Sequence, residues 1–121
     1  MKRLLVLLCL GAAPAAAQPF LAHLPDVPLA PGFTELADAG FLFDTPEGRI
    51  AETVVAGGAD AAATLSFYRE TLRQLGWISQ QGRPAQRQPE VFAREGERLT
   101  LAVDRPAPRL TLRLTVTPEK H

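Results

Sequence analysis

Residues 60–78 decide the fold of this chain, and they read DAAATLSFYRETLRQLGWI. Asp60 is typical of the residue just before a helix, because its carboxylate accepts hydrogen bonds from the first free backbone N–H groups. Apolar side chains then recur at helical spacing and form one stripe: Ala61, Leu65, Tyr68, Leu72 and Leu75. Gly76 is typical of a helix end. The stretch predicts one amphipathic helix, with a strand opening at Trp77 and Ile78.

Strands on the C-terminal side offer an apolar surface for this helix. Residues 110–117 alternate Leu or Val with Thr or Arg, which predicts a strand with one buried and one wet face. Residues 98–104 show a similar alternation, and residues 90–94 precede them across a short Glu-Gly-Glu turn.

Upstream of the helix, residues 41–45 and 49–55 flank the sequence Thr45-Pro46-Glu47-Gly48. Pro and Gly in these positions indicate a hairpin turn. Short links of this kind require antiparallel neighbours. We therefore predict an α+β fold at residues 33–121: an antiparallel β-sheet of about five strands, in the order β-β-α-β-β-β, with one helix packed on one face.

The first 17 residues have the three parts of a secretory signal peptide. Lys2 and Arg3 precede the apolar run 4–10, and Ala15-Ala16-Ala17 offers a cleavage site before Gln18. The run is too short for a stable transmembrane anchor. Acylation of Cys9 is the alternative. Eleven arginines against two lysines, with 19 alanines, indicate a GC-rich bacterial genome, so we expect a periplasmic protein.

Residues 18–32 follow as a Pro-rich segment with four prolines among apolar side chains. Because each proline removes a backbone donor and biases its predecessor to extended geometry, we expect an extended arm. The arm either covers the domain's own core or docks on a partner through residues such as Phe20 and Leu24.

The helix and its exit carry the pattern FYxxxLxxxGW, from Phe67 to Trp77. With Pro31-Gly32 and the hairpin sequence around residues 44–50, this pattern resembles small uncharacterised exported proteins of proteobacteria. The resemblance covers most of the chain after the signal peptide. It implies export, and it brings no catalytic residues to this sequence.

The sequence holds few groups for catalysis. Loss of the signal peptide removes Cys9, the only thiol, so disulfide, thiol and Cys-based metal chemistry are excluded from the exported chain. The remaining serines and histidines lack a nucleophile motif or metal-ligand spacing: Ser66, Ser79, His23 and His121. We predict no catalytic residue, no cofactor and no metal, and hence no enzyme.

Charge is distributed unevenly along the chain. Residues 18–65 hold seven acids and one base, whereas residues 66–121 hold ten bases and six acids. The basic half offers candidate partner-binding residues on or beside the last strands: Arg94, Arg98, Arg109 and Arg113. The alternative is that acidic and basic strands neighbour each other and pair. Nucleic acid is not expected, because the exported chain is not net basic.

These features favour a non-catalytic accessory domain that binds another protein of the bacterial envelope. A second hypothesis is a small binder of an anionic lipid or metabolite in a cleft between helix and sheet. That cleft would be lined by four aromatic residues, and the alternative is that they simply form core: Phe41, Phe43, Tyr68 and Trp77.

Overall fold

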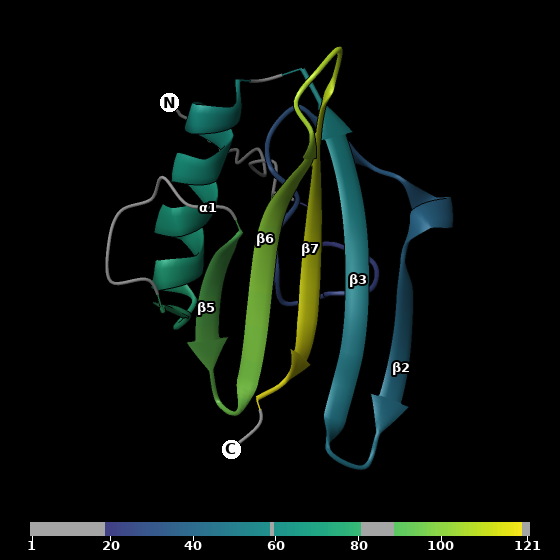
Figure 1. The fold of residues 1–121 in the computed structure, drawn as a ribbon, viewed down its shortest axis with the longest axis vertical. Coiled ribbons are helices and arrows are strands. Elements are labelled where there is room, and N and C mark those ends of the chain that lie inside the picture. Colours follow the sequence, from purple (N-terminus) through teal and green to yellow (C-terminus); the bar gives the residue numbers. More distant parts are fainter. Residues whose placement is uncertain (1–18, 59, 81–88, 120–121) are drawn as a thin grey trace, which may run out of the picture.

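The computed structural model describes residues 19–58, 60–80 and 89–119 (Figure 1). The predicted signal peptide, its cleavage site and Cys9 lie outside the described residues. Within the described ranges, no helix combines the length and the apolar character that a membrane crossing requires.

The described chain forms an antiparallel sheet of seven strands with one α-helix, which confirms the α+β class. In chain order the elements are β1 (Phe33–Glu35), the 3-10 turn η1 (Ala37–Ala39), β2 (Phe41–Thr45), β3 (Gly48–Gly57), α1 (Ala61–Gln74), β4 (Ile78–Ser79), β5 (Glu90–Arg94), β6 (Glu97–Arg105) and β7 (Leu110–Pro118). The predicted count of about five strands and their order are wrong. The extra strand before the helix is β1, whose three residues are too few to show an alternation.

The sheet does not follow chain order. Its strands lie side by side as β1-β3-β7-β6-β5-β4, and β2 pairs with β3. The first hairpin therefore adds to the last strand, as Figure 1 shows, with Ala51 of β3 opposite Val116 of β7. This crossover places the acidic hairpin beside the basic last strand.

Both ends of α1 are closed by the residues that the sequence indicated. The carboxylate of Asp60 accepts a hydrogen bond from the Ala63 N–H at 3.0 Å. At the other end, Gly76 takes a left-handed backbone with φ of 96°, and the Trp77 N–H donates to the Leu72 carbonyl at 2.9 Å. Three residues of the predicted stripe are buried and the other two partly buried, so the amphipathic helix is confirmed.

The Pro-rich segment is a compact loop and not the extended arm that we predicted. Phe20 forms a bridge with Pro28, and the Leu21 N–H donates to the Val27 carbonyl at 2.9 Å. Prolines are compatible with this loop because turns need few donors and favour the proline φ. We name residues 19–32 the N-terminal loop. Four of its apolar side chains belong to the main core: Leu21, Leu24, Val27 and Ala30.

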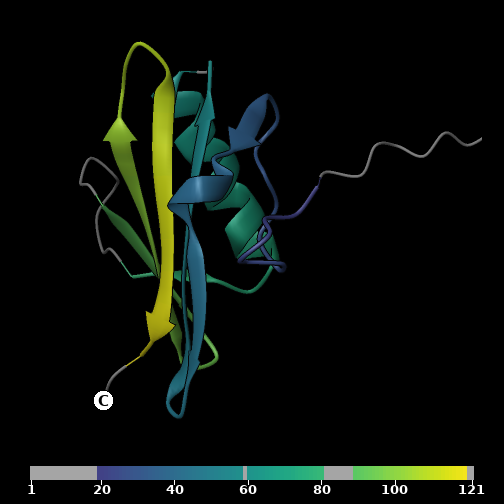
Figure 2. The same cartoon turned by 90° about the vertical axis from the view of Figure 1, so that its right-hand side faces the viewer.

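The N-terminal loop and α1 lie on the same side of the sheet (Figure 2). They are joined by Tyr68, whose hydroxyl donates to the Pro28 carbonyl at 2.8 Å and accepts from the Ala30 N–H at 2.9 Å. We call this side the covered face and the opposite side the open face. The predicted alternation of β7 is confirmed, because Leu110, Leu112, Leu114 and Val116 are buried in the covered face.

Candidate functional site

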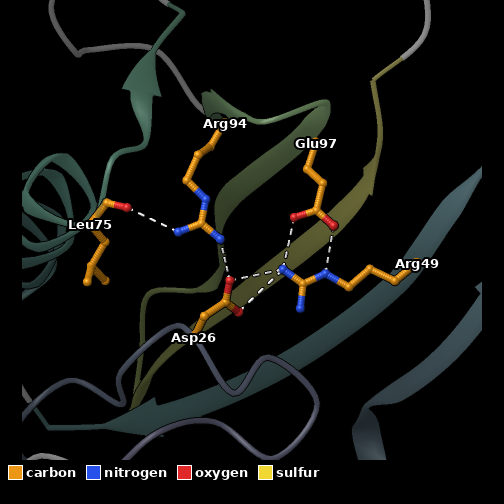
Figure 3. Close-up of polar contacts among 5 residues, drawn as sticks. All are labelled: Asp26, Arg49, Leu75, Arg94 and Glu97. Atoms are coloured by element: carbon orange, nitrogen blue, oxygen red, sulfur yellow. Dashed lines mark hydrogen bonds and ion pairs between the residues drawn. The ribbon is translucent and has the colours of Figure 1, made fainter.

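A network of four charged side chains anchors the N-terminal loop to the sheet (Figure 3). Asp26 of the loop pairs with Arg49 of β3 at 3.1 Å and with Arg94 of β5 at 2.5 Å. Arg49 also holds Glu97 of β6 through two hydrogen bonds, of 2.8 and 2.9 Å. The network therefore joins the loop to three strands.

Arg94 makes two further contacts. Its Nη1 donates to the carbonyl of Leu75 at the end of α1, at 3.1 Å. Its guanidinium lies 4.5 Å from the centre of the Trp77 ring, a cation–π geometry that is worth more when the groups are withdrawn from water. One side chain thus contacts the loop, the helix end and the first core residue after the helix.

The network shifts the pKa values of Asp26 and Arg49. Burial by itself would raise the pKa of Asp26, but hydrogen bonds from Arg49 and Arg94 outweigh this effect and hold that pKa below its ordinary value. The bonds to Glu97 raise the pKa of Arg49. A carboxylate with a lowered pKa and guanidinium groups cannot exchange protons near neutral pH. The geometry is that of a structural clamp.

A second ion pair fixes α1 to β5. Arg69 donates to both carboxylate oxygens of Glu90, at 2.7 to 3.1 Å, and Glu90 is only 3% exposed. Bidentate pairing of this kind satisfies a buried carboxylate. The same hydrogen bonds raise the pKa of Arg69.

The structure does not gather the predicted partner-binding arginines into one basic surface. Arg94 lies on the covered face, within the network described above. Arg98 lies on the open face and pairs with Glu119 at 3.0 Å. Arg109 lies in the loop before β7, where its Nη2 donates to the Ala56 carbonyl at 3.4 Å.

Arg113, in the middle of the open face, is also paired. It contacts Glu52 of β3 on one side and Asp104 of β6 on the other, at 2.5 and 3.0 Å. Acidic and basic strands therefore neighbour each other and neutralise, the alternative that the sequence left open. The alternation of the strands does indicate on which face each arginine lies. Arg94 has the same parity as buried Phe92, whereas Arg98 has the opposite parity to buried Leu99.

The two loop residues that we considered for partner binding differ in their exposure to solvent. Leu24 has no exposed surface and is part of the core, so it is not accessible to a partner in this fold. Phe20 is 53% exposed at the start of the described chain and stays accessible.

The four aromatic residues of the predicted ligand cleft do not line a common space. Tyr68 and Trp77 are fully buried in the core, and burial raises the pKa of the Tyr68 hydroxyl. Phe43 is 60% exposed on the open face, where its ring centre lies 5.4 Å from that of Phe41. The sheet separates the two pairs, so these residues do not form a helix–sheet cleft.

The open face has a feature that the sequence reasoning missed. A cleft of about 1160 Å³ lies beside the turns β2–β3 and β5–β6 and the end of β7. Figure 1 shows these turns at the lower end of the sheet. The lining of the cleft includes Ile50, Arg98 and three acidic residues, Glu47, Glu95 and Glu119. Because these residues are far apart in the sequence, only the strand pairing brings them together.

The described part of the chain holds no cluster of metal-ligating side chains. Across residues 19–58, 60–80 and 89–119, no three His, Cys, Asp or Glu side chains are grouped closely enough to hold a metal ion. Comparison of the chain with protein-family models, with curated proteins and with solved structures gives no match.

Proposed function

We propose that this chain is a non-catalytic interaction domain of the bacterial envelope, exported by its signal peptide, and that it binds another envelope protein through the open face. One observation carries the proposal: helix and loop cover one face of the sheet, and no second layer of described elements covers the other (Figure 2). Large apolar side chains on that face and at its edges stay in water, among them Phe43 and Ile78.

The state of the charged groups supports a binding role over catalysis. Arginine and carboxylate side chains on both faces are held in pairs. A general acid or base needs a titratable group with a pKa near the working pH. Among the resolved pKa shifts, the carboxyl groups move down and the arginines move up, so all stay charged near neutral pH.

Site-specific photo-crosslinking in the bacterial envelope tests the proposal. A benzophenone amino acid replaces Thr100, which lies half-exposed in the middle of the open face opposite Thr115. The matched control carries it at Ser66, an exposed residue of α1. We expect a discrete adduct with one envelope protein from position 100 and none from position 66.

Two results would contradict this function. The first is the absence of any adduct from position 100 at native expression. The second is a cytoplasmic full-length chain, shown by intact mass after fractionation, because cleavage before Gln18 should leave a mature periplasmic protein.

A further inference from the structure

The edge of the sheet at β2 (Phe41–Thr45) has backbone groups available for a further strand. Residues of an antiparallel pair alternate between exchanging both hydrogen bonds and exchanging none. In a hairpin with a two-residue turn the pair that closes the turn is of the first kind, here Thr45 and Gly48, and the register runs from there without interruption. The backbone groups of Leu42 and Asp44 therefore point away from β3. They have no hydrogen-bond partner among the described residues.

This edge lacks most of the features that protect exposed strands. Proteins usually shield an edge with lysine, proline, a bulge or a covering segment. Here Leu42 is 44% exposed and Phe43 is 60% exposed. Because Phe41 and Phe43 stack on the open face, the edge presents an apolar strip beside its unpaired backbone groups.

The charges around the edge select its partner. Asp44 lies in the strand, Glu47 in the turn, and Glu95 lines the adjoining cleft. The neighbouring bases are already held, since Arg49 turns to the covered face to pair with Asp26 and Arg98 pairs with Glu119. The surroundings of the edge are therefore acidic and complement a basic segment.

The same charges disfavour a second copy of this chain at the edge. Antiparallel pairing of two β2 strands about Phe43 would put Asp44 of each copy opposite Leu42 of the other, so that the two Asp44 carboxylates become diagonal neighbours on the same face. Like charges that are cross-strand neighbours repel and weaken the pairing. A foreign basic strand meets no such repulsion.

We infer that the β2 edge binds an extended segment of a partner protein by strand addition, and that this segment alternates apolar and basic side chains. The segment pairs with the backbone of Leu42 and Asp44, and its apolar side chains pack beside Phe43 on the open face. Its basic side chains point to the other side of the sheet, where the exposed Asp44 lies opposite Arg49 in the register. This inference rests on the proposed function and specifies the surface and the chemistry of the partner.

The test uses a capped heptapeptide of alternating lysine and valine as the probe, with a glutamate–valine peptide of the same length as its counterpart. We expect the basic peptide to bind, to shift the amide signals of Leu42 and Asp44 in NMR spectra, and to weaken as salt is raised. The acidic peptide should not bind.

Two variants locate the binding. Leu42→Pro removes an outward N–H without removing a bond to β3, and should weaken binding about tenfold or more. Asp44→Lys reverses the charge at an exposed position and should weaken it by a similar factor, independently of any effect of proline on folding. Glu70→Gln is the matched control, because it removes an acid from the exposed face of α1 and should leave binding unchanged.

Three outcomes overturn the inference: equal binding of the acidic peptide, binding that both edge variants leave intact, or self-association of the protein through β2 in sedimentation experiments. The photo-crosslinking experiment separates the two proposals. An adduct from position 100 together with no peptide binding at β2 would leave the interaction domain standing and remove the edge as its docking surface. The absence of both would remove both.

Discussion

The two faces of the sheet are made from the same strands and differ in what the chain places over them. On the covered face, α1 and the N-terminal loop bury Leu112 and Leu114. The buried carboxylate of Glu90 accepts hydrogen bonds from two guanidinium nitrogens of Arg69. On the open face, Arg113 is paired but 38% of its side chain remains exposed. Pairing on the covered face therefore joins the loop and the helix to the sheet, whereas pairing on the open face links strands that backbone hydrogen bonds already hold together.

The largest loss of stability should come from the N-terminal loop, if the loop is part of the core and not a surface attachment. Leu24→Ala should lower the free energy of unfolding by about 2–5 kcal/mol, because it removes a fully buried side chain and leaves a cavity. Phe20→Ala is the control, since its side chain is half-exposed, and should change the value by at most about 1 kcal/mol. Urea unfolding measures both. Similar small effects would mean that the loop does not belong to the core.

A second comparison sets an ion pair of one face against an ion pair of the other. Arg94→Ala should destabilise by about 2 kcal/mol, because it leaves Asp26 and the Leu75 carbonyl with fewer partners and uncovers the Trp77 ring. Arg113→Ala should cost less than about 1 kcal/mol, because solvent screens its two pairs. Equal costs in urea unfolding would remove the distinction between the faces.

The stability of the covered face should depend on pH through Asp26. The folded-state pKa of Asp26 lies below its unfolded value, so the unfolded chain binds more protons in acid. The contribution of Asp26 is therefore fully present above the ordinary aspartate pKa of 3.8 and is lost as pH falls through the lower folded value. Asp26→Asn should flatten this acid limb.

The matched control for the acid limb is Asp104→Asn on the open face. Thermal unfolding between pH 5 and pH 2 follows both variants. An acid limb that is as steep in Asp26→Asn as in the unmodified protein would show that the clamp does not depend on this carboxylate.

Much of the fold could be predicted because the apolar pattern of its main elements repeats over many residues. The five-residue stripe of α1 and the alternation along β7 leave few alternatives. β1 could not be predicted in this way, because its three residues gain their place from Phe33, whose ring lies over Gly57 so closely that a Cβ there would come within 2.7 Å of it. The N-terminal loop was misread because prolines restrict the local backbone but do not determine where the chain turns back.

The candidate site was less predictable than the fold. The sequence showed that acidic and basic segments exist, but only the pairing of β3 with β7 shows that Glu52 reaches Arg113. Phe41 and Phe43 were expected between helix and sheet, as cleft lining or as core, because hydrophobicity alone does not say whether a strand lies at an edge. The exposure of Phe43 follows from the position of β2 outside β3, a non-local property of the sheet.

The smallest change in the free energy of unfolding is expected at the β2 edge. Phe43→Thr should change the free energy of unfolding by at most about 0.5 kcal/mol, since threonine suits a strand and the phenyl ring gains little burial in the isolated domain. Phe92→Thr makes the same replacement on the covered face, where the ring is 2% exposed, and should cost about 3 kcal/mol or more. If Phe43→Thr destabilised the protein strongly and in a concentration-dependent way, the open face would be covered by another copy in solution. A small, concentration-independent change would instead leave Phe43 free to contribute to binding without contributing to folding, which is the property that distinguishes an interaction residue from a core residue.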